Sequence, residues 1–205
     1  MIDNATIAAI ATPAGEGGIG VVRISGSDAA EIAGRVFRKM GRRAAPVDLA
    51  TVESHRLIYG KIVDPATESL IDEVLLGWMA GPHTYTKEDT VELSCHGGPV
   101  PLQETLRVVL ESGARQAEPG EFTLRAFLNG RLDLTQAEAV LNVIGARTAE
   151  SLRLAVSDLA GDLTRRLAPA NAALISLLAY LDASADFPDD EIDTSDIDHG
   201  LAAAE

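Results

Sequence analysis

The chain has 205 residues, 46% of them apolar, and a formal net charge of −14. It contains no run near the roughly 18 consecutive apolar residues of a membrane helix, and its N-terminus lacks the basic start and long apolar run of a signal peptide. The single cysteine, Cys95, excludes an internal disulfide framework and suits a reducing compartment, so we expect a cytoplasmic protein. Nucleic-acid binding depends on lysine and arginine to neutralise phosphates. A chain this acidic is therefore a poor candidate for a primary RNA- or DNA-binding surface.

Residues 1–118 have the pattern of a mixed α and β domain. Strands are expected over residues 6–12 and 20–25, on either side of a glycine-rich turn. A helix is expected over residues 27–41, capped by Ser27 or Asp28. The remaining elements expected in this part are a hairpin of strands over 55–64 and 70–80, a strand over 90–98 and a helix over 99–113.

Beyond residue 118 the strand-like runs stop and helical spacing takes over. Asn129-Gly130 ends a first short helix, and Thr135, with Glu138 three residues later, fits a capping box. From Ala137 to Leu167 apolar residues recur every three or four positions, which predicts one helix of about 30 residues.

Pro169 is expected to break or kink that helix. A further helix over residues 170–187 is expected to end at Phe187-Pro188. The acidic residues between Asp182 and Asp198, with no basic residue among them, indicate a solvated connection.

Two nucleotide-binding motifs are excluded by their context. Residues 15–20 match G-x-G-x-x-G, but a dinucleotide site needs a helix after the last glycine, and Val21-Val22-Arg23-Ile24 is strand-forming. The glycines instead indicate a tight loop between strands. A P-loop needs G-x-x-x-x-G-K-[ST], whereas Gly60-Lys61 is followed by Ile62.

The histidines and the cysteine do not form a metal-binding pattern. The four histidines stand far apart, and Cys95 and His96, adjacent on a strand, point to opposite faces. Cys95 has no evident activating base, so we interpret it as a buried core thiol.

Three charged residues stand out on ordered elements beside glycines. Arg23 alternates with Val22 and Ile24 in one strand, and Glu92 alternates with Val91 and Leu93 in another. Arg131 follows the helix stop at Asn129-Gly130. Simpler explanations stay open for each of them: an exposed strand edge for Arg23 and Glu92, or, for Arg131, a cation that complements the dipole of the preceding helix.

Four blocks of the sequence carry a resemblance to a known family. They are ATPAGEGGIGVVRISG (11–26), GPHTYTKEDTVELSCHGGP (81–99), PGEFTLRAFLNGRLDLTQAEAV (119–140) and DFPDDEID (186–193). In that order they closely resemble the N-terminal part of the tRNA-modification GTPase family MnmE, also called TrmE. The resemblance runs over essentially the whole chain.

The resemblance implies an α+β fold in two parts. Residues 1–118 would form a folate-binding and dimerisation domain, similar to the folate-binding part of the glycine-cleavage aminomethyltransferase. Residues 119–205 would form the first part of a long-helix, all-α domain that ends where a GTPase domain is inserted. GTP, magnesium and potassium would then bind only through that further domain, and the 205 residues alone would have no GTPase activity.

The family pattern also implies a set of binding residues. It places Arg23, Glu92 and Arg131 at the folate-contacting positions, where some members have lysine in place of Arg131. A carboxylate such as Glu92 can accept the adjacent N–H and amino donors of a reduced pterin, and an arginine fork matches the carboxylates of the folate tail. The expected ligands are 5-formyl-tetrahydrofolate or 5,10-methylene-tetrahydrofolate, with no metal and no catalytic residue in this part.

By the same resemblance, the whole protein would be a homodimer that modifies C5 of the wobble uridine of tRNA. Its expected partners are a flavin-dependent protein of the MnmG (GidA) family and tRNA, with no membrane. Two alternatives stay open: a free-standing, folate-dependent aminomethyltransferase-like enzyme, and a structural dimerisation module without a ligand. Ligand binding, turnover without GTP and oligomeric state would discriminate among the three.

Overall fold

The computed structural model describes residues 4–41 and 45–186, and it divides the chain into two compact units, Met1–Arg131 and Leu132–Glu205. Unit 1 combines a mixed sheet with helices and unit 2 is helical, so the predicted α+β class is confirmed. The division falls after Arg131, later than the expected boundary at 118, because α3 (Glu121–Leu128) is joined to the first unit through the buried Arg125. No helix among the described residues is long and apolar enough to cross a membrane.

The sheet of unit 1 has eight strands in the order β4-β3-β5-β6-β7-β2-β1-β8. Only the pairing of β1 with β8 is parallel, and the other neighbours are antiparallel. The predicted strands and the predicted hairpin are therefore confirmed, whereas the short strands β3, β4 and β8 were not predicted. The strands are β1 (Ile7–Ile10), β2 (Gly17–Ser25), β3 (Phe37–Lys39), β4 (Ala45–Pro46), β5 (Arg56–Val63), β6 (Leu70–Met79), β7 (Thr90–Gly97) and β8 (Arg115–Gln116).

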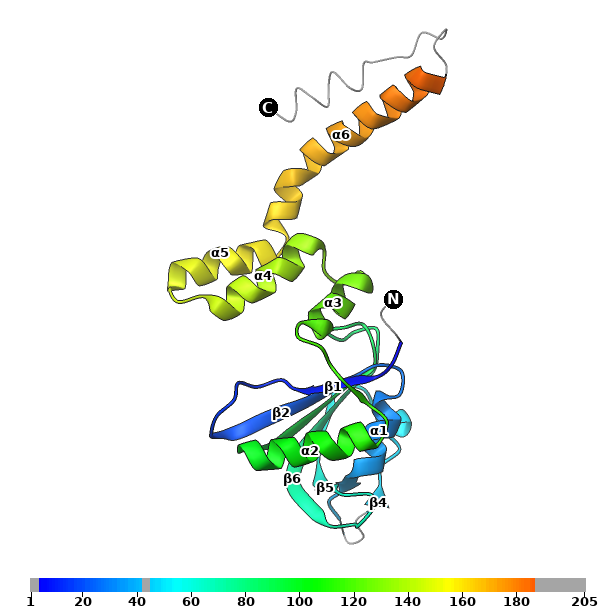
Figure 1. The fold of residues 1–205 in the computed structure, drawn as a ribbon, viewed down its shortest axis with the longest axis vertical. Helices are drawn as coiled ribbons and strands as arrows, with labels where there is room; N and C mark the ends of the chain where they lie inside the picture. The colour runs from blue at the N-terminus through cyan, green and yellow to red at the C-terminus, as the bar shows by residue number, and fades with distance from the viewer. Residues whose placement is uncertain (1–3, 42–44, 187–205) are drawn as a thin grey trace. The chain divides into compact units, whose positions relative to one another are not determined.

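One face of the sheet is covered by helices α1 (Ala29–Val36) and α2 (Pro99–Glu111), as Figure 1 shows. Alternation along the strands sends Val22, Ile24 and Leu93, all fully buried, into the core beneath these helices. The residues between them in sequence, Arg23 and Glu92 included, therefore point to the other face.

The glycine-rich segment lies where two antiparallel strands, β2 and β7, come close together. β2 begins at Gly17, within the G-x-G-x-x-G pattern, so a strand and not a helix follows, as predicted. A Cβ added at Gly97 would come within 2.6 Å of the Gly17 carbonyl oxygen. Glycine is therefore required where β2 and β7 approach each other.

The helix predicted over residues 27–41 is shorter in the structure. It ends at Val36, because Phe37 is extended and enters β3, where its fully buried ring packs over Gly60 of β5. A Cβ on Gly60 would lie 2.2 Å from that ring. The predicted cap is also wrong: Asp28 occupies the N-cap position, but neither its side chain nor that of Ser27 caps the helix. A short 3-10 helix, η1 (Leu49–Thr51), follows β4.

The described part of unit 2 contains three helices, where the sequence predicts one long helix from Ala137 to Leu167 and a further helix over residues 170–187. They are α4 (Leu134–Gly145), α5 (Ala149–Leu159) and α6 (Asp162–Asp186). The long-helix prediction is wrong because local signals override the apolar period. Thr148 and Ser151 cap a new helix reciprocally, and Gly161 adopts a φ of +85° between α5 and α6.

Two other details of unit 2 are corrected, and one prediction falls outside the described residues. The N-cap of α4 is Asp133, which forms a capping box with Gln136, and not the predicted Thr135 with Glu138. The predicted helix break at Pro169 is absent, because α6 continues through this residue. The predicted end at Phe187-Pro188 and most of the acidic run lie outside the described residues.

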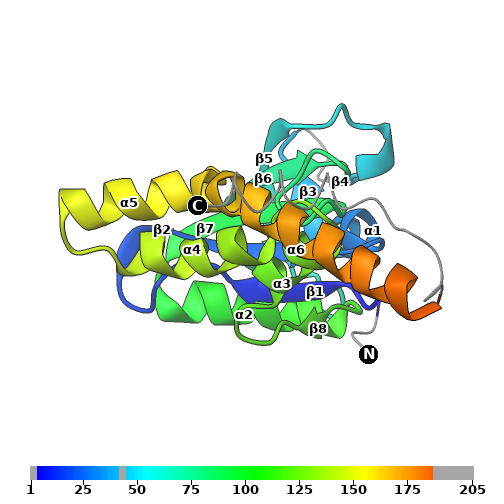
Figure 2. The same cartoon turned by 90° about the horizontal axis from the view of Figure 1, so that it is seen from above.

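Helices α4 and α5 run antiparallel and lie side by side in both views (Figures 1 and 2). Gln136 of α4 donates to the Leu159 carbonyl at the end of α5, 3.0 Å away, and Thr164 of α6 donates to the Asp133 carboxylate at 2.6 Å. The start of α4 is therefore hydrogen-bonded both to the C-terminal end of α5 and to the first turn of α6.

Candidate ligand site

Arg23 and Glu92 face each other across the β2–β7 ladder. They are direct register partners, and both Nε and Nη2 of Arg23 donate to the same oxygen, Glu92 Oε1, at 2.9 and 2.7 Å. Both side chains are about one-third exposed (27% and 33%). Within the described part of the chain the other oxygen, Oε2, accepts no hydrogen bond, so Glu92 presents one open acceptor next to a compensated charge.

Arg131 is fixed by the way in which α3 ends. The N–H of Gly130 donates to the Phe127 carbonyl and the N–H of Arg131 donates to the Ala126 carbonyl. Gly130 has a φ of +68°, so these two bonds form a Schellman motif. The predicted helix stop at Asn129-Gly130 is confirmed, and it fixes the backbone from which Arg131 projects.

The Arg131 side chain is exposed and lies over the ring of Tyr85, with 4.7 Å between the guanidinium carbon and the ring centroid. Among residues 4–41 and 45–186 it forms no ion pair. A cation held by an aromatic face keeps its charge for a ligand, whereas a cation in a salt bridge does not. Within the described ranges Arg131 is therefore a positive group of this site that no carboxylate compensates.

Tyr85 connects the two arginines, and it was not among the residues predicted from the sequence. The Arg23 guanidinium carbon lies 5.7 Å from the Tyr85 centroid and 5.5 Å from that of Phe122. The Tyr85 hydroxyl is bonded to Thr123 Oγ1 at 2.9 Å. A usable signal was present: only 4% of the chain is aromatic, and both rings fall in the blocks around Glu92 and Arg131.

A network of buried and partly buried ionic groups joins the elements that carry the site. Arg125, 3% exposed, donates to the Glu88 carboxylate at 3.2 Å, to Glu121 at 3.0 Å and to the Ala5 carbonyl at 2.8 Å. Glu88 in turn accepts from Ser25 Oγ at the end of β2. α3, the Tyr85 segment and β2 are thereby joined through one guanidinium.

The same network shifts the ionisation of Glu121. The Arg115 guanidinium, the Glu118 N–H and Arg125 all donate to its carboxylate, and together they outweigh desolvation and lower the pKa of Glu121 to about 2. Glu121 is 5% exposed, so its charge is stabilised by fixed donors rather than by water.

Cys95 and His96 lie on opposite faces of β7, as predicted. Cys95 is buried, and desolvation raises the pKa of its thiol to about 11, so the interpretation as a core thiol is confirmed. The His96 ring is exposed and its Nδ1 bonds the buried Asp72 carboxylate, which raises the pKa of His96. In the described ranges no three histidine, cysteine or acidic side chains come together as a metal ion would require.

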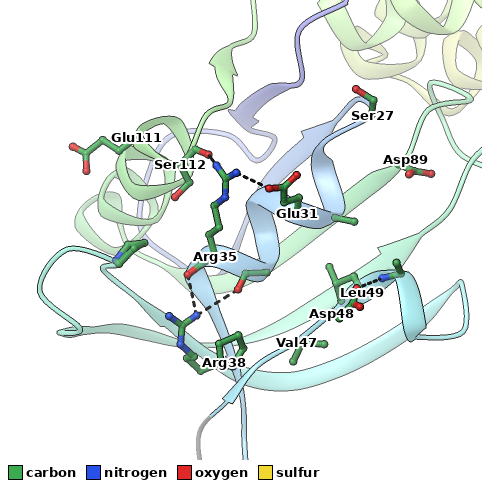
Figure 3. A pocket seen from close by; sticks show the side chains of 15 residues that line it. Ser27, Glu31, Arg35, Arg38, Val47, Asp48, Leu49, Asp89, Glu111 and Ser112 are labelled. Carbon is green, nitrogen blue, oxygen red and sulfur yellow. Dashed lines mark hydrogen bonds and ion pairs between the residues drawn. The ribbon is translucent and has the colours of Figure 1, made fainter.

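A separate groove of about 980 Å³ lies on the helical side of the sheet, between α1, η1 and the end of α2 (Figure 3). Its arginines are engaged by the protein itself. Arg35 donates to the Ser112 carbonyl and to Glu31, and Arg38 donates to the carbonyls at the end of α1. None of the three predicted site residues lines this groove.

The sequence matches two family models in succession. Residues 6–131 match the N-terminus of the GTP-binding protein TrmE, and residues 134–205 match the MnmE helical domain. The fold thus belongs to a class in which an α+β N-terminal domain is followed by a helical domain, and the two matches meet where the structure divides the chain.

Curated relatives agree with the family models. The chain is 48% identical to the tRNA modification GTPase MnmE of Alkaliphilus oremlandii over 98% of its own length and 43% of the relative. It is 52% identical to that of Chloroflexus aurantiacus (98% and 44%) and 53% identical to that of Heliobacterium modesticaldum (91% and 39%). The chain belongs to the MnmE family of tRNA modification GTPases, and it spans less than half the length of these relatives.

Proposed function

We propose that this chain is the folate-binding and dimer-forming part of a tRNA modification GTPase. The whole protein would act in the cytoplasm on C5 of the wobble uridine of tRNA, together with a flavin-dependent partner of the MnmG (GidA) family. GTP, magnesium and potassium would bind through a GTPase domain. The support for tRNA modification and GTP hydrolysis is the name of the relatives, which extend well beyond the matched region.

The observation that carries the folate proposal is that Arg131 and Arg23, the partner of Glu92, both lie over the ring of Tyr85. Glu92 Oε2 is open to the N–H and amino donors of a reduced pterin. The Arg131 guanidinium, which no carboxylate compensates in the described ranges, can pair with the carboxylates of the glutamate tail. The half-buried ring of Tyr85, over which both arginines lie, offers apolar contact. These residues fit 5-formyl- or 5,10-methylene-tetrahydrofolate, which supplies a one-carbon unit when bound.

Arg23 has a different role in this proposal from that of Arg131. Its guanidinium is already engaged by Glu92, so it orients the carboxylate and leaves only the second oxygen to the ligand. Both strands are ordered before any ligand arrives, and this ordering reduces the conformational entropy lost on binding.

Calorimetric titration of the 205-residue chain with 5-formyl-tetrahydrofolate tests the proposal. Glu92→Gln keeps the shape but removes the charge, and we expect binding about 10- to 100-fold weaker, the range for hydrogen bonds to a charged group. Arg131→Met should weaken binding by a similar factor. The matched control is Glu53→Gln, because Glu53 also accepts two Arg56 donors on one oxygen and lies at an exposed position.

Two results would contradict the folate proposal. The folded parent chain could fail to bind the ligand, or Glu92→Gln and Arg131→Met could both bind it as tightly as the parent. Either result would favour the structural module without a ligand.

The dimer proposal is supported by exposed apolar side chains on the uncovered face of the sheet. Leu57 is 73% exposed, Tyr59 50% and Leu75 43%, and Tyr59 and Leu75 are register partners on β5 and β6. Contiguous apolar surface of this kind is typical of protein interfaces. Light scattering is expected to give twice the 21.5 kDa of the chain, and Leu57→Glu/Leu75→Glu should give the monomer. A parent that is monomeric at micromolar concentration would refute dimerisation.

A further inference from the structure

The Tyr85 ring is carried by a tight turn that faces the end of α3. Thr84 Oγ1 donates to the Glu88 carbonyl at 2.6 Å, which closes a loop of five residues. Within it, Lys87 adopts a φ of +60°, in the left-handed region. Tyr85 therefore sits on a constrained loop, but that constraint by itself does not set its position relative to Arg131.

Two reciprocal hydrogen bonds join this loop to the helix stop. Asn129 Nδ2 donates to the Thr86 carbonyl at 2.7 Å, and Lys87 Nζ donates to the Gly130 carbonyl at 3.0 Å. Each segment thus contributes one side-chain donor and one backbone acceptor. We call this pair of bonds the latch.

The latch adjoins the two residues that stack. Thr86 follows Tyr85 in the chain and Gly130 precedes Arg131, so each acceptor carbonyl lies one residue away from a stacking partner. The donors of the latch reach backbone oxygens, so they fix main-chain positions rather than flexible side-chain ends. Without the latch the loop would still reach α3 through the Tyr85 hydroxyl and the Glu88 carboxylate. The main-chain segments next to Tyr85 and Arg131 would lose their two direct bonds, and the 4.7 Å stack itself contributes only about 0.5–1 kcal/mol at an exposed position.

We propose that Asn129 and Lys87 are positioning residues that hold Arg131 over Tyr85 and so preorganise the anion-binding end of the site. The inference rests on the proposed function for the nature of the ligand, whereas the arrangement of the two residues is measurable without one. Both side chains are exposed, so substitutions at these positions are expected to leave the core intact.

The test uses three variants of the whole chain. Asn129→Asp is isosteric, but a carboxylate cannot donate to the Thr86 carbonyl. Lys87→Met removes the Nζ donor and keeps the stem, and Lys87→Arg restores a donor. Asn142→Asp, at an exposed position of α4, is the control for the added charge.

The first readout needs no ligand. The side-chain protons of Arg131 are expected to show an upfield ring-current shift from Tyr85 in NMR spectra, lost in Tyr85→Leu. Asn129→Asp and Lys87→Met should reduce this shift, and Lys87→Arg should recover it. The second readout is the affinity for 5-formyl-tetrahydrofolate, which is expected to fall about threefold for Asn129→Asp and for Lys87→Met, and about tenfold for the double variant. Lys87→Arg is expected to restore it.

The outcomes separate the two proposals. If the ring-current shift is unchanged in both Asn129→Asp and Lys87→Met, or if it is reduced while folate affinity stays the same, the positioning role is refuted. If the parent binds no folate but the shift responds as described, the proposed function fails and the arrangement of Arg131 by the latch stands. An equal loss of affinity in Asn142→Asp would show that added charge, and not the latch, is responsible.

Discussion

Replacing Arg125 by methionine is expected to destabilise unit 1 strongly. The guanidinium is 3% exposed and compensates two carboxylates, Glu88 and Glu121, while it also satisfies the Ala5 carbonyl. Breaking a buried ion pair costs about 3–5 kcal/mol. Without Arg125, Glu121 keeps the Arg115 guanidinium, whereas Glu88, with 24% of its side chain exposed, loses this pairing, so we expect a cost toward the lower end of that range. A domain whose whole stability is about 5–15 kcal/mol would lose a large part of it.

The assay for this prediction is urea unfolding followed by the fluorescence of Trp78. It is the only tryptophan of the chain and is buried in unit 1, so its signal reports that unit separately from the helices of unit 2. Arg56→Met is the control, because the Arg56–Glu53 pair is exposed and should contribute only about 0–1 kcal/mol. Equal losses for the two variants, at equal m-values, would refute the reasoning that burial makes Arg125 important.

Three further predictions follow from the ionisation of single groups. The pKa of Glu121 is depressed, chiefly by Arg115, from 4.5 to about 2, so its contribution to stability is complete above pH 4.5 and is lost as pH falls toward 2; urea midpoints of Glu121→Gln should lack that part of the acid dependence. The pKa of His96 is raised by Asp72, so this pair stabilises the fold below the ordinary histidine pKa of 6.5 and the effect disappears as pH rises through the higher folded value; an NMR titration in which Asp72→Asn left the pKa of His96 unchanged would contradict this. Burial raises the pKa of Cys95 to about 11, so a disulfide reagent at pH 8 should label the native chain far more slowly than the chain in denaturant, and equal rates would exclude a buried thiol.

Alternation along a strand was a sufficient guide to the faces of β2 and β7. It predicts that Val22 and Ile24 point one way and Arg23 the other, and the burial of each residue agrees. It does not predict that Arg23 and Glu92 are register partners, because they lie 69 residues apart and the order of strands in a sheet is not encoded in the period of either strand. The resemblance placed both residues in one site, and the structure supplies the salt bridge between them.

Helical periodicity was the weaker guide in unit 2. Apolar residues recur at helical spacing straight through residues 146–148 and 160–161, because α4, α5 and α6 each present an apolar side of their own. The breaks are made by local chemistry, a reciprocal cap at Thr148 and a left-handed Gly161, whose effect is confined to one turn. Similarly, the predicted cap Thr135 is replaced by Asp133, because a carboxylate two residues earlier accepts the hydrogen bond from the third N–H of the helix.

The two arginines of the site show how an acidic chain can keep one positive charge available for a ligand. The charge of Arg23 is compensated by Glu92, so this guanidinium orients a carboxylate of the protein. Arg131 is stacked on Tyr85, and a ring holds a guanidinium in place without neutralising it. A carboxylate in the position of Tyr85 would hold Arg131 more firmly but would compete with an anionic ligand for the guanidinium.

The aromatic contact is weaker than a salt bridge, so the helix stop at Gly130 and the latch are needed to hold Arg131. Backbone and hydrogen-bond constraints provide the rigidity that a salt bridge would otherwise provide. In a chain with a net charge of −14, this division of roles leaves an acceptor at Glu92 and a cation at Arg131, linked through Arg23 and the ring of Tyr85.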